Sequence, residues 1–173
     1  MSLLRFLGID RAADAGSETA TVRRIVEALE RQDPEAARYI ARFAYVLGRV
    51  AQADHEVSAE ETRVMERIVM ERSGLPEEQA ILVVQIAKSQ TILFGATEDY
   101  LVTREFARTA TRDQKLALLD CCFAVSAADR DVSAEEEAAV RQIAGELGLE
   151  HADFIAARSA YRDYLAVLKA ARR

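Results

Sequence analysis

Two short stretches of the chain carry the same run of hydroxyl and acidic side chains. The first is Val57-Ser58-Ala59-Glu60-Glu61 and the second is Val132-Ser133-Ala134-Glu135-Glu136. An aspartate precedes each run, and we call the resulting segments the first elbow (residues 54–61) and the second elbow (residues 129–136). Side-chain oxygens recur at alternate positions, in Asp54, Glu56, Ser58 and Glu60 and in Asp129, Asp131, Ser133 and Glu135. Because Ca²⁺ and Mg²⁺ prefer oxygen ligands, this pattern predicts a divalent-cation site.

The same residues have a structural interpretation, which we favour because it needs fewer assumptions. An aspartate at the end of a helix accepts a hydrogen bond from a backbone amide two or three residues on and forms an Asx turn. The serine of each elbow then caps the following helix. Glu61 or Glu136, three residues after its serine, completes a capping box.

The cation hypothesis has a defined set of ligands. They are the elbow carboxylates at alternate positions, Asp54, Glu56, Glu60, Asp129, Asp131 and Glu135. An EF-hand loop does not fit, because Ala59 and Met65 stand where it needs a glycine and a bidentate glutamate. His55 would add a nitrogen ligand for Zn²⁺, but Arg130 replaces it in the second elbow. No cofactor is required by this pattern, and Ca²⁺, Mg²⁺ and Zn²⁺ stay open as alternatives.

The elbows also predict an acidic contact surface. Acids are concentrated in two short segments, as Asp54, Glu56, Glu60, Glu61, Asp129, Asp131, Glu135, Glu136 and Glu137. A protein partner with a basic segment would neutralise such a surface. The residues expected to bind it are Glu60, Glu61, Glu135 and Glu136. The common alternative for a charge run of this kind is a solvated helix surface.

Charge and composition exclude several classes of function. The chain has 173 residues, a formal net charge of -6 and a pI of about 5.1, whereas binding to a phosphate backbone needs clustered Lys and Arg. Its only histidines are His55 and His151, and it has no phosphate-binding glycine loop. We therefore expect a non-enzymatic protein without a nucleic-acid partner. A carboxylate-dependent hydrolase is the catalytic alternative, and it requires two converging acids.

The two cysteines point to the core and to a reducing compartment. Cys121 and Cys122 are adjacent, so they cannot join distant parts of the chain through disulfides. The spacing that separates the two elbows also aligns these cysteines with Val46 and Leu47, which favours buried thiols. The cysteines are therefore expected to be reduced. The sequence also has no apolar run that approaches the roughly 20 residues needed to cross a bilayer. Together these two features predict a cytoplasmic protein.

The remaining sequence predicts the helices that position the elbows. Its helix-favouring composition is typical of an all-α protein. Apolar spacing and capping signals predict helices over residues 17–31, 34–53, 59–73, 97–108 and 134–147, others beginning at 76 and 112, and a last one carrying Phe154, Ala157, Tyr161, Leu165 and Leu168. These elements make a single-domain bundle of about seven or eight helices. The helix that begins at Pro76 is expected to be central, because it is apolar around most of its circumference.

An internal repeat organises this bundle. The repeat offset, which we define as the spacing from Asp54 to Asp129, aligns the elbows without a break from Val57 to Glu61. It also aligns Val50 with Val125 and Ile68 with Ile143. Neither copy can bury its apolar face alone. We therefore predict pseudo-twofold symmetry, with repeat units at about 35–90 and 112–169 inside a helical domain over residues 17–173.

The first residues, 1–16, are predicted to be a flexible leader. Residues 1–8 are short and apolar and carry one cation. A frayed terminus or a strap over the core is favoured for them over peripheral contact with a membrane or a partner groove.

Both elbows, with the helix ends before them, resemble a known signature. Val50-Ala51-Gln52-Ala53-Asp54 followed by Glu56-Val57-Ser58-Ala59-Glu60-Glu61 is similar to the motif of TerB-like domains, and the second copy is similar too. These domains include tellurite-resistance TerB and the amino-terminal region of DjlA-type co-chaperones. The resemblance covers about residues 35–169. It implies an all-helical fold with internal pseudo-twofold symmetry, linked to stress response, acidic metal-associated surfaces and protein assembly near membranes.

Overall fold

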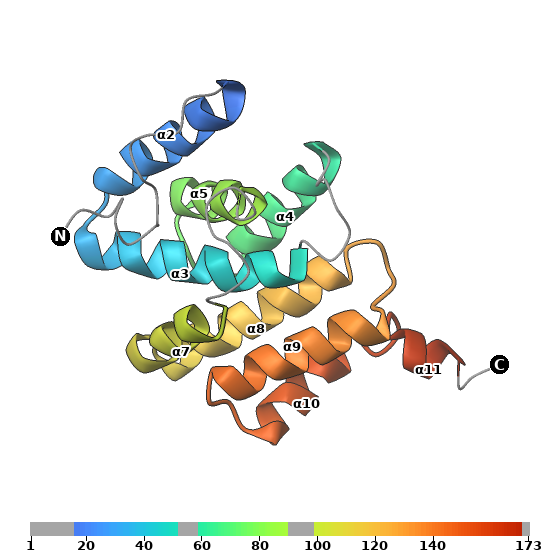
Figure 1. The fold of residues 1–173 in the computed structure, drawn as a ribbon. Coiled ribbons are helices and arrows are strands. Elements are labelled where there is room, and N and C mark those ends of the chain that lie inside the picture. The colour runs from blue at the N-terminus through green and yellow to red at the C-terminus, as the bar shows by residue number, and fades with distance from the viewer. Residues whose placement is uncertain (1–15, 52–58, 90–98, 171–173) are drawn as a thin grey trace.

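The computed structural model describes residues 16–51, 59–89 and 99–170, and most of these residues lie in helices (Figure 1). The helices are α2 (Gly16–Glu30), α3 (Pro34–Ala51), α4 (Ala59–Arg72), α5 (Glu77–Lys88), α7 (Asp99–Thr109), α8 (Arg112–Ser126), α9 (Ala134–Glu146), α10 (His151–Ala160) and α11 (Ala166–Ala170). The all-α prediction is confirmed, with nine helices in the described ranges where seven or eight were expected in all. None of these helices is long and apolar enough to cross a membrane.

Helix α3 is the centre of the fold. Every residue from Ile40 to Gly48 is buried, so this helix has no solvent face over that stretch. It packs against α5, α7 and α8. The prediction that α5 would be central is wrong, because α5 covers one side of α3 and leaves Ile81 37% exposed. The apolar residues on a helix surface do not reveal how many neighbouring helices will pack against it.

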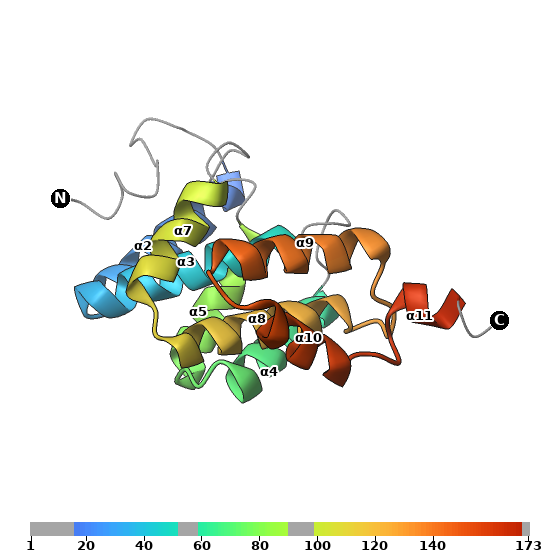
Figure 2. The ribbon, with the colours of Figure 1, turned by 90° about the horizontal axis from the view of Figure 1, so that it is seen from below.

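The helices around the two elbows follow the same order along the chain. In the described residues, α3 precedes the first elbow and α4 follows it, as α8 and α9 do for the second elbow. Helices α4 and α5 lie on one side of α3, and α8, α9 and α10 lie on the other (Figure 1). Helix α8 packs against both α4 and α9 and runs between them when seen from below (Figure 2). The pseudo-twofold symmetry itself stays a prediction.

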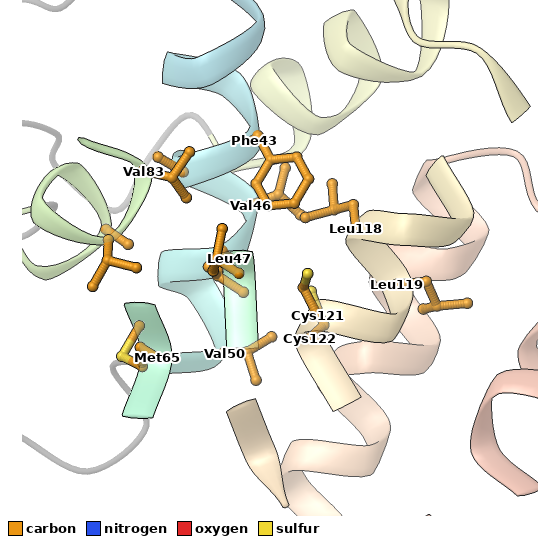
Figure 3. Close-up of a cluster of buried hydrophobic side chains, with 14 of the residues drawn as sticks. Phe43, Val46, Leu47, Val50, Met65, Val83, Leu118, Leu119, Cys121 and Cys122 are labelled. Atoms are coloured by element: carbon orange, nitrogen blue, oxygen red, sulfur yellow. The ribbon is translucent and has the colours of Figure 1, made fainter. Parts of the chain in front are cut away.

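The two repeat units share one hydrophobic core. Its buried side chains form a single cluster among the described residues. In its middle, Phe43 and Leu47 of α3 lie beside Leu118 and Cys121 of α8 (Figure 3). Cys121 and Cys122 are both 0% exposed, which confirms the prediction of core thiols.

Helices begin and end at capping residues that the sequence predicted. Thr111 Oγ1 accepts a hydrogen bond from the Gln114 amide at 3.2 Å, and Gln114 Oε1 accepts one from the Thr111 amide at 2.8 Å. This reciprocal box begins α8. Gly74 and Gly148, with φ of 72° and 68°, follow the ends of α4 and α9 in the left-handed region that glycine tolerates best.

The last predicted helix is broken into two, which is a correction. A continuous helix with Phe154, Tyr161 and Leu165 on one face was expected, but α10 ends at Ala160 and α11 begins only at Ala166. Apolar spacing predicted the burial of these three side chains correctly, since they are 2%, 6% and 0% exposed. It did not predict that the helix would be interrupted between Ala160 and Ala166.

The break follows from backbone pairing with the second elbow. The Val132 amide donates to the Tyr164 carbonyl at 2.9 Å, and the Val132 carbonyl accepts from the Ala166 amide at 2.9 Å. These two bonds form an isolated parallel bridge between Val132 and Leu165. A continuous helix would use the same carbonyl and amide internally, so the two arrangements exclude each other.

A partly buried polar network ties the first unit to the second. Arg49 of α3 donates to Glu146 of α9 at 2.5 Å and to the Thr103 hydroxyl of α7 at 2.8 Å. Gln142 donates to the other oxygen of Glu146 at 2.8 Å. Hydrogen-bonded charges of this kind are strong, so the network fixes how α3, α7 and α9 meet.

The predicted leader lies almost wholly outside the described residues. These begin at residue 16, and Gly16 is already the first residue of α2. The predictions for residues 1–8 therefore fall outside the structural description.

Candidate functional site

The second elbow joins α8 to α9 through a tight turn. After the end of α8, the Arg130 amide donates to the Ala127 carbonyl at 2.9 Å and so reverses the chain. Arg130 has a φ of 68°, in the left-handed region. A residue with a β-carbon adopts this conformation at a cost of about 1–3 kcal/mol, so the turn holds a strained residue.

Asp129, the aspartate that opens the second elbow, is engaged within this turn. Its Oδ1 accepts a hydrogen bond from the Asp131 amide at 2.9 Å. This is the Asx turn that the structural interpretation predicted. One oxygen of a predicted metal ligand is therefore already bonded to the backbone.

Ser133 and Glu136 form the predicted capping box at the start of α9. Ser133 Oγ accepts from the Glu136 amide at 3.1 Å, and Glu136 Oε2 accepts from the Ser133 amide at 2.8 Å. Glu136 was also predicted to bind a partner, and one of its oxygens is now engaged in the cap. Glu135, one residue earlier, has an exposed side chain.

Asp131 pairs with a lysine from the far end of the described chain. Lys169 Nζ donates to Asp131 Oδ1 at 2.7 Å and to the Arg130 carbonyl at 2.6 Å. The side chains of Lys169 and Asp131 are 41% and 57% exposed, so the pair lies at the surface. Two oxygens of the second elbow therefore already hold an ammonium group.

Glu137 does not contribute to an exposed acidic surface, which corrects that part of the prediction. It is only 7% exposed. Its Oε1 accepts from Arg158 Nε at 2.9 Å and from Arg141 at 3.2 Å. The hydrogen bond from Arg158 is the largest influence that holds the pKa of Glu137 below its usual value. Glu137 thus joins α9 to α10.

The described residues contain no assembled cation site. No group of three or more His, Cys, Asp or Glu side chains among them is arranged to hold a metal ion. In the second elbow, Asp129 is bonded to an amide and Asp131 to a lysine. The predicted ligands Asp54 and Glu56 lie outside the described residues, so the cation hypothesis for the first elbow stays a prediction.

The first elbow is described only at its end. Residues 52–58 lie outside the structural description, whereas Glu60 and Glu61 are exposed in the first turn of α4. Glu135 and Glu136 occupy the same positions in the first turn of α9. Both glutamate pairs therefore lie at a helix amino terminus, where the helix dipole stabilises negative charge.

The two adjacent cysteines have buried thiols of low reactivity. Burial, with a smaller contribution from the charge of Asp120, raises the pKa of Cys121 to about 12. Burial also raises the pKa of Cys122. Thiols of this kind stay protonated near neutral pH, so neither is a nucleophile there.

Several important residues carried no signal in the sequence. Lys169 reaches Asp131 across 38 positions. Tyr161 and Arg72 both donate to Asp120, at 2.7 Å each, although the three residues come from separate parts of the chain. Local spacing cannot reveal such partners, because packing brings them together.

Comparison with known proteins agrees with this helical architecture. Residues 40–159 match the family described as tellurite resistance protein TerB. No curated protein and no solved structure matches the chain. The matched residues are more than half of the chain, and they include both elbows. The chain therefore belongs to the tellurite resistance protein TerB family.

Proposed function

We propose that this chain is a non-enzymatic, cytoplasmic interaction module that binds a basic segment of a protein partner through the acidic first turns of α4 and α9. The observation that carries the proposal is the exposure of Glu60 and Glu135 at matching first-turn positions. The TerB family supports a setting in stress response or at the cell envelope. The proposal needs no cofactor.

Electrostatics favour such a partner. Carboxylates at a helix amino terminus are stabilised by the helix dipole. The net charge of -6 adds a longer-range attraction for basic segments. Because exposed charges are screened over about 10 Å at 0.1 M salt, binding should weaken as salt is raised.

The test removes charge while it preserves the helix caps. One variant combines Glu60→Gln, Glu61→Gln, Glu135→Gln and Glu136→Gln. Glutamine serves in a capping box, as Gln114 does at the start of α8, so the fold should stay helical. Capture of partners from lysate at low salt should fall about tenfold, since four exposed ion pairs of about 0.3–0.4 kcal/mol each sum to about 1.4 kcal/mol. Quantitative mass spectrometry of the captured proteins measures this change.

A matched control separates the elbows from overall charge. Glu77 and Glu78 are adjacent exposed acids in the first turn of α5, outside both elbows. The variant E77Q/E78Q therefore makes the same change as E60Q/E61Q at a different helix start. Equal losses of capture in these two variants, or full capture by the fourfold variant, would refute the proposal.

A further inference from the structure

The carboxyl-terminal segment of the described chain is fixed beside the second elbow. Val132 bonds through both its amide and its carbonyl to this segment, at Tyr164 and Ala166. Leu165, between these two residues, is 0% exposed and anchors the segment in the core. Helix α11 follows directly, and it lies beside the turn between α8 and α9 (Figure 1).

Beyond this anchor, the segment makes a polar contact that is open to solvent. Helix α11 has no buried residue. Its Lys169 gives one ammonium group to the Asp131 carboxylate and to the carbonyl of Arg130, the strained residue of the turn. The lysine therefore satisfies oxygens that the elbow would otherwise present to an external cation.

We propose that Lys169 is a tethered ligand of the second elbow, which competes there with a lysine-rich segment of a partner. This inference rests on the proposed function, because it assigns an internal competitor to one of the two acidic elbows. The lysine of the competitor and the lysine of the partner make the same contact, an ammonium group on a carboxylate and a carbonyl. The tether gives Lys169 a high effective concentration at the elbow.

Lys169 is not repeated in the sequence. The repeat offset places Phe94 at the position that matches Lys169. The position that matches Lys169 therefore holds no lysine. The two elbows should differ in their affinity for a basic segment, and the difference should depend on Lys169.

Displacement needs only the outer part of the segment to move. The Lys169 and Asp131 side chains are both well exposed, so their ion pair is weak and sensitive to salt. Leu165, its bridge to Val132, and Leu168, which packs against the core, can all stay in place while the Lys169 side chain leaves Asp131. The size of an exposed ion pair limits the competition to about fivefold in affinity.

The experiment titrates the full chain with a pentalysine peptide at low salt and follows backbone amides by NMR. Three proteins are compared, the natural chain, K169M and K169R. The amides of residues 129–136 report the second elbow, and those of Glu60 and Glu61 report the first. In K169M, affinity at the second elbow should rise up to about fivefold while affinity at the first is unchanged. K169R keeps the charge and should stay close to the natural chain.

The outcomes separate this inference from the function on which it rests. Equal affinity of the second elbow in the natural chain and in K169M would overturn the inference, while binding at the first elbow would leave the proposed function standing. A gain in K169R as large as in K169M would also overturn it, since the charge would then not be what competes. If pentalysine shifts neither elbow in any protein, both the inference and the proposed function fail.

Discussion

The two predicted repeat units hold matching helix pairs together by different means. In the second unit, Glu137 of α9 bonds to Arg158 of α10 at 2.9 Å. The repeat offset places Thr62 of α4 and Val83 of α5 at these positions in the first unit, where they are 7% and 0% exposed. The same interhelix position is therefore charged in one unit and uncharged in the other.

A second pair of matching positions shows the same difference. Tyr161 donates to Asp120 of α8 at 2.7 Å in the second unit. The matching residues of the first unit are Ile86 and Tyr45, each 1% exposed. At these two pairs of positions, the first unit therefore has buried uncharged side chains where the second unit has charge-assisted hydrogen bonds. Salt and pH should act mainly on the second unit, since they alter charges and not apolar contacts.

The largest expected effect is the loss of stability when a core residue of α3 is truncated, compared with truncation of the matching residue of α8. Leu47 of α3 and Cys122 of α8 are related by the repeat offset, and both are 0% exposed. Leu47→Ala should lower the free energy of unfolding by about 2–5 kcal/mol, because it leaves a cavity at the central helix. Cys122→Ala removes one atom and should cost about 1 kcal/mol. Urea unfolding measures both, and equal losses would contradict the central position of α3.

A smaller effect is expected when the Glu137–Arg158 contact of the second unit is replaced by the uncharged pair that stands at the matching positions of the first unit. Arg158→Val alone leaves the buried Glu137 carboxylate with only the largely exposed Arg141, and should cost about 2–3 kcal/mol. The double variant E137T/R158V carries the residues of the first unit and should be more stable than R158V. A double-mutant cycle by urea unfolding measures the coupling. Simple additivity of the two single losses would show that the contact adds nothing.

The smallest and most gradual effect is on the pH dependence of stability. Hydrogen bonding by Arg158 lowers the pKa of Glu137 in the folded protein. Burial tends to raise the pKa of Glu146, but hydrogen bonds from Arg49 and Gln142 outweigh it, so this pKa is lowered too. Both carboxylates therefore stabilise the fold above the usual glutamate pKa of 4.5, and this contribution is lost as pH falls through their folded-state values.

The same comparison of units sharpens this prediction. Urea unfolding between neutral and acidic pH should show a shallower decline for E137T/R158V than for the natural chain, because the variant has lost one of the two carboxylates. T62V, at the matching position of the first unit, is the control and should follow the natural chain. Identical slopes for all three proteins would mean that Glu137 does not link folding to pH.

Local features of the fold could be predicted well from the sequence. The capping boxes at Thr111 and Ser133 were both expected, because a cap depends on residues three positions apart. The broken last helix could not be predicted, because Val132 supplies backbone partners from another part of the chain. The central place of α3 escaped prediction for a similar reason, since an apolar helix face does not identify its neighbours.

The candidate site shows the same division between local and distant interactions. By itself the sequence determined where the helices begin and end around the second elbow, and that Asp129 and Ser133 would bond to nearby amides, because these bonds join residues close along the chain. Only the tertiary structure decided which carboxylates stay open to solvent. Asp131 pairs with Lys169, which is 38 positions away in the sequence, and Glu137 pairs with Arg158, which is 21 positions away. The packing of helices selects such partners, and no local spacing encodes them.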